Sequence, residues 1–133
     1  MPARSTHFIA AQAALICLCL QSAPAQAQAN ATAGATLFAS RCAACHSLAP
    51  TRKPGPMLSG IYGRRAGSVA GYAYSNALKR SAVIWNDKTL DRWLAGPPAY
   101  IPGVNMQAQV DSAADRRALI AYLKSISRPH PTR

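Results

Sequence analysis

The sequence predicts an all-α domain in which three to five short helices are joined by long loops. Cap residues precede several runs with helical apolar spacing, no run shows the alternation of a half-buried strand, and proline and glycine gather between the runs. The chain has 133 residues, and half of them are hydrophobic. This length allows one small domain and excludes an enzyme with two large lobes.

Residues 1–29 have the order of a secretory signal peptide. A basic start precedes an apolar run from Phe8 to Leu20, and repeated Ala-x-Ala triplets follow. The alternative is a retained membrane anchor, but a spanning helix needs about 20 apolar residues and this run is shorter. We therefore expect cleavage within residues 25–29, export to a bacterial periplasm without a permanent membrane anchor, a domain over residues 30–127 and a disordered tail over residues 128–133.

The first expected helix of the mature chain is capped by Asn30 or Thr32 and runs to about Cys45. Its apolar stripe consists of Gly34, Leu37 and Phe38. The stretch Ser47–Gly71 is rich in proline, glycine and basic residues and has no sustained period, so we expect a loop there. A brief helix over residues 57–62 is the alternative for part of it.

Two further helices are expected in the middle of the chain. A short one covers Tyr74–Lys79. The next is capped by Asn86 or Asp87, runs through Leu94 and ends at Gly96, which two prolines follow.

The segment Tyr100–Val110 is again irregular, and a final helix follows it. Ser112 with Asp115 three residues later resembles a capping box, and the helix closes before Pro129. Its apolar face consists of Leu119, Ile120, Tyr122, Leu123 and Ile126.

The motif Cys42-Ala43-Ala44-Cys45-His46 is CxxCH, the attachment sequence of c-type haem. Two thiols at this spacing reach the two vinyl groups of one haem, and the adjacent imidazole becomes the proximal iron ligand. Such a cofactor would also fill the thin core expected from few large side chains and many loops. The motif therefore predicts one covalent haem c, attached through Cys42 and Cys45 and ligated by His46.

Three other interpretations of the cysteine pair are open. A redox-active CxxC would need a thioredoxin-like βαβ setting, which the pattern lacks. A structural zinc site needs about four ligands, and the mature chain offers only the two cysteines, His46 and His130. A disulfide would leave the histidine and the thin core unexplained. Cys17 and Cys19 leave with the signal peptide.

The sixth iron ligand is expected to be Met106. Met57 lies only eleven residues beyond His46, which leaves little chain to reach the other haem face, and His130 lies in a proline-rich tail. Met106 lies sixty residues beyond His46 in an irregular segment that is able to wrap the far side of a macrocycle.

From about Asn30 to Ser127 the sequence resembles the class I cytochromes c of the mitochondrial and photosynthetic-bacterial type. CxxCH alone indicates only c-type haem, and the order of later landmarks makes the resemblance specific. These are Gly55-Pro56, Gly63-Arg64, Gly71-Tyr72-Ala73-Tyr74-Ser75, Trp85, Tyr100-Ile101-Pro102-Gly103 with Met106, and Leu119-Ile120-Ala121-Tyr122-Leu123-Lys124. The resemblance implies a cytochrome c fold wrapped around one haem.

The resemblance also implies roles for individual residues. Gly34 and Phe38 would pack against Leu119 and Tyr122 where the first and last helices cross. The Pro56 carbonyl would bind the free ring nitrogen of the proximal histidine and so orient the imidazole. Three residues occupy the positions that hold a buried haem propionate in the family: Arg64, Tyr74 and Trp85.

The sequence departs from the family around Met106. Val104 replaces a common Thr, Trp93 takes the place of a Tyr whose hydroxyl reaches the methionine sulfur, and Ala108 replaces an aromatic residue. Basic residues common in this region are replaced by Pro98, Ala99 and Asn105. The iron ligands therefore match better than the surroundings of Met106.

The charge balance is strongly basic, with 15 Lys and Arg against 4 acidic residues and a net charge of +11. An acidic protein, nucleic acid or an anionic membrane would suit this charge. No nucleic-acid motif is present. We expect a monomer that docks acidic redox proteins or membrane redox complexes through Arg41, Arg52 and Lys53 beside the attachment motif.

The function expected from these features is one-electron Fe(III)/Fe(II) transfer between redox partners in the periplasm, without enzymatic activity. One alternative is a gas-binding haem sensor or weak peroxidase, which would follow if Met106 binds loosely. Another is a haem subunit of a larger dehydrogenase or oxidase.

Overall fold

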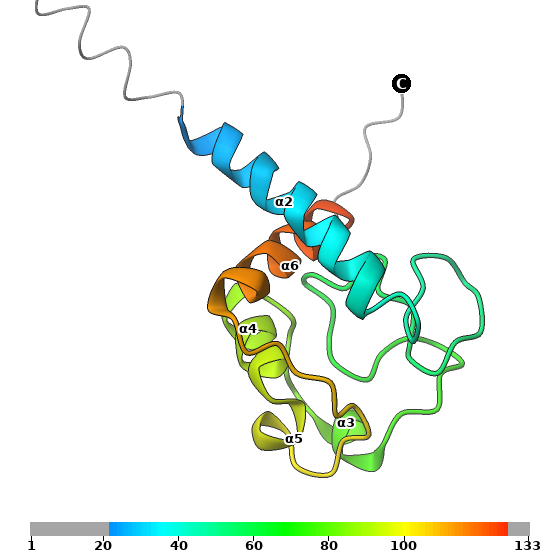
Figure 1. Cartoon of the computed structure of the whole chain (residues 1–133). Coiled ribbons are helices and arrows are strands. Elements are labelled where there is room, and N and C mark those ends of the chain that lie inside the picture. The colour runs from blue at the N-terminus through cyan, green and yellow to red at the C-terminus, as the bar shows by residue number, and fades with distance from the viewer. Residues whose placement is uncertain (1–21, 128–133) are drawn as a thin grey trace, which may run out of the picture.

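The computed structural model describes residues 22–127 and is all-α over that range, as predicted. Its helices are α2 (Ser22–Arg41), α3 (Asn76–Arg80), α4 (Asp87–Ala95), α5 (Pro97–Tyr100) and α6 (Ala113–Ser125). The only pairing of extended backbone in these residues is an isolated bridge between Arg65 and Ile84. Long loops join the helices on one side of the α2–α6 pair (Figure 1).

Helix α2 differs from its predicted bounds at both ends. It begins at Ser22 rather than at Asn30 or Thr32. Thr32 lies inside the helix, where its hydroxyl donates to the Gln28 carbonyl (3.1 Å) instead of capping. The alanine-rich stretch before Thr32 favours helix strongly. The helix ends at Arg41, and a turn covers residues 42–45.

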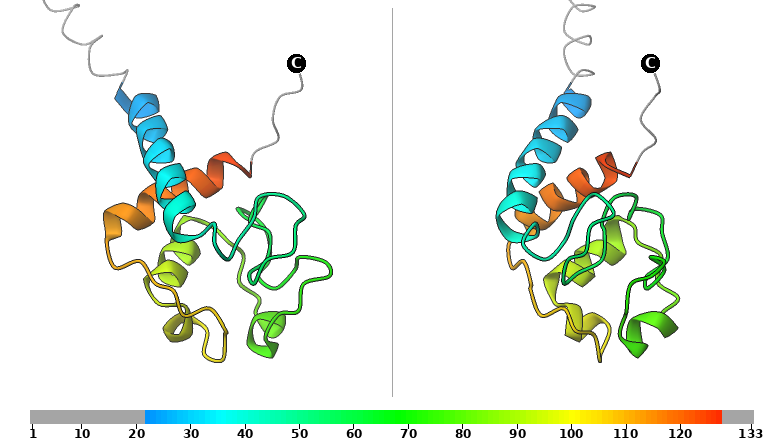
Figure 2. Two further views of the ribbon diagram at one scale, coloured as in Figure 1. Left: turned by 45° about the vertical axis from the view of Figure 1, so that its right-hand side comes forward. Right: turned by 90° about the vertical axis from the view of Figure 1, so that its right-hand side faces the viewer.

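The start of α2 overlaps the last residues of the predicted signal peptide, so its cleavage within residues 25–29 stays a prediction. The apolar run of that peptide and the predicted tail over residues 128–133 lie outside the described residues. The N-terminal part of α2 projects beyond the rest of the structure in both views of Figure 2. Across residues 22–127, no helix combines the length and apolar character needed to span a bilayer.

Helices α2 and α6 cross in direct contact, as the views of Figure 2 agree. Gly34 lies so close to α6 that a Cβ there would be 2.0 Å from the Ala118 carbonyl oxygen and 2.7 Å from the Tyr122 Cβ. The rings of Phe38 and Tyr122 pack with centroids 5.5 Å apart. Leu119 is buried in the same core. The predicted packing at this crossing is confirmed.

The caps of α4 and α6 fix where these helices begin. Asn86 caps α4, its side chain accepts from the Thr89 N–H (3.0 Å), and the Thr89 hydroxyl accepts from the Asn86 N–H (2.8 Å). Ser112 caps α6 by accepting from the Asp115 N–H (3.2 Å), which is one half of the predicted capping box. Asn86, rather than Asp87, is therefore the cap of α4.

Three other predicted segments differ in detail. Helix α3 is capped by Ser75 and is shifted by one or two residues from Tyr74–Lys79. The turn α5 was missed, because the prolines after Gly96 start a new helical turn as well as ending α4. The alternative helix over residues 57–62 is wrong, since this segment is held as a loop, with the Leu58 N–H donating to the Ser47 carbonyl (2.9 Å).

Candidate cofactor site

Between α4, α6 and the long loops lies a cavity of about 400 Å³ with mostly apolar walls. This volume falls within the about 300–1,000 Å³ typical of cofactor sites. The walls include all nine residues predicted for the site: Cys42, Cys45, His46, Pro56, Arg64, Tyr74, Trp85, Trp93 and Met106. The fold therefore brings together residues that are up to 64 positions apart in the sequence, from Cys42 to Met106.

The two cysteines lie on the turn that follows α2. The N–H groups of Cys42 and Ala43 both donate to the Phe38 carbonyl (2.9 Å each), and the His46 N–H donates to the Cys42 carbonyl (2.8 Å). Cys42 is half-buried and Cys45 is exposed. Burial raises the pKa of the Cys42 thiol, while the charge of the neighbouring Arg41 opposes this.

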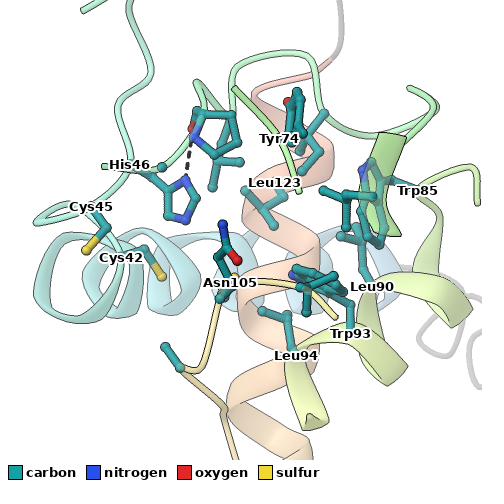
Figure 3. A pocket seen from close by; sticks show the side chains of 18 of the residues that line it. Cys42, Cys45, His46, Tyr74, Trp85, Leu90, Trp93, Leu94, Asn105 and Leu123 are labelled. Carbon is teal, nitrogen blue, oxygen red and sulfur yellow. Dashed lines mark hydrogen bonds between the residues drawn. The ribbon is translucent and has the colours of Figure 1, made fainter. Parts of the chain in front are cut away.

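The imidazole of His46 is oriented by the loop beneath it. Its Nδ1 is 2.8 Å from the Pro56 carbonyl oxygen (Figure 3). Because a carbonyl only accepts, Nδ1 carries the proton and the lone pair of Nε2 is free for a metal. Burial lowers the pKa of His46, the hydrogen bond to Pro56 opposes this, and the positive charge of Lys53 lowers it further.

Gly55 allows the loop to approach this imidazole. A Cβ at Gly55 would lie 2.4–2.9 Å from three atoms of the His46 ring. The loop is further held by the Gly55 N–H, which donates to the Cys45 carbonyl (2.7 Å), and by the Tyr72 hydroxyl, which donates to the Pro54 carbonyl (2.5 Å). From the sequence, Gly55 is identified only as part of the Gly-Pro pair, and this close approach to His46 was not predicted.

Met106 lines the cavity from the irregular segment after α5, as its predicted placement requires. Met57 is not among the described residues of the cavity wall, and its carbonyl accepts from Arg64 Nη2 (3.0 Å). His130 lies outside the described residues. Asn105 turns its carboxamide into the cavity below His46 (Figure 3).

Arg64 and Tyr74 supply the polar part of the wall. Arg64 donates from Nη1 to the Ser59 carbonyl and from Nη2 to the Met57 carbonyl (3.0 Å each), which holds the guanidinium in place. Burial lowers the pKa of Arg64, and the nearby Tyr74 opposes this. Burial also raises the pKa of Tyr74, so both groups lie in a partly desolvated environment.

Trp85 and Trp93 form the inner wall beside α4. Their rings meet edge to face with centroids 5.3 Å apart, and both side chains are buried. Neither indole N–H donates to another residue within the range 22–127. No fully buried side-chain nitrogen described there lacks a partner, so neither indole nitrogen is fully buried. Both tryptophans line the cavity.

The arrangement fits haem c. Figure 3 places Cys42 and Cys45 at one side of the cavity and Tyr74 and Trp85 at the opposite side. Haem has vinyl groups that react with thiols, carboxylates that need cationic and N–H partners, and an apolar ring between them. In residues 22–127 no three His, Cys, Asp or Glu side chains gather as a metal cluster would require, so the zinc interpretation gains no support.

Of the three cations predicted for docking, Lys53 also makes a hydrogen bond within the site. Arg41, Arg52 and Lys53 are all exposed. Lys53 Nζ donates to the Ala43 carbonyl inside the CxxCH turn, so Lys53 also stabilises the attachment segment. This bond joins residues ten positions apart and has no signal in the sequence.

Comparison with known proteins agrees with this geometry. Residues 31–127 match the family model described as Cytochrome c. Cytochrome c of Gibberella zeae is 48% identical over 94 residues, which cover 68% of this chain and 89% of the relative. Cytochrome c of Arabidopsis thaliana is 43% identical over 108 residues, covering 79% and 96%. Cytochrome c of Euglena viridis is 44% identical over 95 residues, covering 70% and 93%.

Proposed function

Because the chain belongs to the cytochrome c family, we propose that it carries single electrons between protein partners in a bacterial periplasm. The family binds one covalently attached haem c and functions in electron transfer. The periplasmic location rests on the signal-peptide pattern of residues 1–29. The proposal assigns the chain no enzymatic reaction.

The observation that carries the proposal is the His46–Pro56 hydrogen bond. It leaves Nε2 free at the cavity while two thiols lie at the same side. We assign Cys42 and Cys45 to thioether attachment, His46 to the proximal iron position and Met106 to the distal one. When bound, haem c supplies a one-electron Fe(III)/Fe(II) couple.

The other residues of the wall anchor and tune the group. We assign Arg64, Tyr74 and the N–H of Trp85 to a haem propionate, because all three residues line the cavity. The Pro56 carbonyl fixes the imidazole and increases its basicity. Trp93 is buried in the same wall and adds apolar surface to it.

Docking is proposed to be electrostatic. Arg41 and Arg52 are exposed at the site, and Arg41 also lines the cavity. Such charges attract acidic redox proteins or acidic faces of membrane complexes over long range. We propose that the carrier is a monomer in this exchange.

Two variants test the ligand assignment. Met106→Ala removes the proposed distal ligand, and Met57→Ala is the matched control, because Met57 is not part of the described cavity wall. We expect the long-wavelength Met-to-iron absorption band of the oxidised protein to vanish in Met106→Ala and to persist in Met57→Ala. Loss of the band in Met57→Ala alone would contradict the assignment.

Carbon monoxide separates the carrier from the alternatives. With two protein ligands on the iron, the reduced wild-type protein should bind the gas only slowly at neutral pH. Rapid binding would favour the gas sensor or weak peroxidase. Isolation from membranes with a stoichiometric catalytic partner would favour a subunit of a larger oxidoreductase.

A further inference from the structure

The loop that carries Met106 has few hydrogen bonds of its own. The Ile101 N–H donates to the Pro97 carbonyl (2.9 Å), and the next backbone bond along the described chain joins the Val110 N–H to the Leu94 carbonyl (2.8 Å). Within residues 22–127, none of positions 102–109 takes part in a backbone–backbone bond. Segments of this kind open locally at a low free-energy cost, so the anchored ends decide how firmly the loop is held.

Arg116 of α6 holds the C-terminal end of this loop. Its Nη1 donates to the carbonyls of Val110 (3.0 Å) and Asp111 (2.8 Å). Its Nε donates to Asp91 Oδ1 on α4 (2.7 Å). One planar guanidinium thereby joins α6, α4 and the end of the Met106 loop.

The burial of this group makes the clamp effective. The Arg116 side chain is 14% exposed and that of Asp91 is 44% exposed. Removing the guanidinium leaves the carbonyls of Val110 and Asp111 without this donor, in a place where little water reaches the Arg116 side chain. Lysine keeps the charge but lacks the planar fork that serves three acceptors at once.

We propose that Arg116 is a positioning residue that sets how tightly Met106 is held at the distal side of the site. The inference rests on the proposed function, in which Met106 is an iron ligand. Arg116 does not line the cavity wall; it acts through Val110, whose N–H is bonded to α4 and whose carbonyl is bonded to Arg116 itself.

The same helix provides a matched control. Lys124 near the end of α6 pairs with Asp87 of α4 (3.2 Å), but both side chains are more exposed, at 37% and 63%. Lys124 also packs over the Tyr62 ring (4.8 Å to its centroid), and within residues 22–127 it makes no hydrogen bond to the Met106 loop. Lys124→Gln therefore removes an α4–α6 ion pair without touching the loop.

The test measures the rate of carbon monoxide binding to the reduced holoprotein, together with urea unfolding. We expect Arg116→Gln and Arg116→Lys to bind the gas at least about tenfold faster than wild type, equivalent to about 1.4 kcal/mol easier loop opening. Asp91→Asn should show a smaller acceleration because the backbone bonds of Arg116 remain. Lys124→Gln should match wild type.

Equal rates in wild type and all Arg116 variants would overturn the inference, and so would an equal acceleration in Lys124→Gln, which would assign the effect to general loss of stability. If Arg116→Gln does not fold, Arg116→Lys and Asp91→Asn decide the outcome by the same criteria. A wild-type protein that lacks the Met-to-iron band would refute the proposed function instead, before any variant is compared.

Discussion

Replacing Gly34 by alanine tests how closely α2 and α6 approach each other. The added Cβ would lie 2.0 Å from the Ala118 carbonyl oxygen and 2.6 Å from its carbon. Real contacts of this kind are at least about 3.0 Å, so the helices must separate by roughly 1 Å. The obstructing atoms belong to the α6 backbone and cannot rotate away.

The expected cost follows from two opposing effects. Overpacking costs about 1–3 kcal/mol, and a rigid backbone places this site near the upper value. Alanine recovers about 1 kcal/mol through its higher helix propensity. The free energy of unfolding should therefore fall by about 2 kcal/mol, which lowers Tm by about 8–16 °C for a domain of this size.

Urea unfolding of the haem-containing protein, followed by far-ultraviolet circular dichroism, measures this loss. Ala33→Leu is the control, because Ala33 is exposed on the same helix and leucine is nearly as good a helix former. The free energy of unfolding of the Ala33→Leu protein should stay within about 0.5 kcal/mol of the wild-type value. A Gly34→Ala protein as stable as wild type would refute the close crossing.

Three other predictions concern the site and its surface. Gly55→Ala should destabilise the protein by about 1–3 kcal/mol and reduce its haem content, because the added Cβ would overlap the proximal imidazole. Gly60→Ala is the control, since a Cβ there meets nothing within 4 Å and only the φ of +69° is unfavourable. It should cost about 1–2 kcal/mol and retain haem. Burial raises the pKa of Tyr74 above its ordinary 10.0, so wild-type stability should fall as pH rises from about 9 to 11, when the unfolded chain loses the phenolic proton first. Tyr74→Phe should show a shallower fall in urea midpoint, and an identical slope would contradict this. Arg52→Gln should slow electron exchange with anionic hexacyanoferrate more than Arg80→Gln does, and equal effects would place the docking face elsewhere.

The sequence predicted the cofactor site more completely than the helix bounds. CxxCH is a local motif, so His46 and the two cysteines were identified without knowledge of the fold, whereas the role of Pro56 came from the family resemblance. Met106 was predicted by comparing the lengths of chain that separate each methionine from His46. The described cavity wall includes Met106 and does not include Met57.

The missed features depend on long-range contacts. The bonds of Lys53 to the Ala43 carbonyl and of Arg116 to Asp91 join distant residues whose sequence neighbours show nothing unusual. The early start of α2 was missed because a signal-peptide pattern and an alanine-rich helix have the same composition. Turn α5 was missed because proline both ends and begins helices.

The optical spectrum of the purified protein in both redox states tests the haem attachment and both iron ligands together. We expect a pyridine spectrum of haem attached by two thioethers, which Cys42→Ala or Cys45→Ala should alter. We also expect a Met-to-iron band in the oxidised form that disappears on reduction. Unattached haem, or a spectrum without that band, would contradict the assignment of Cys42, Cys45, His46 and Met106.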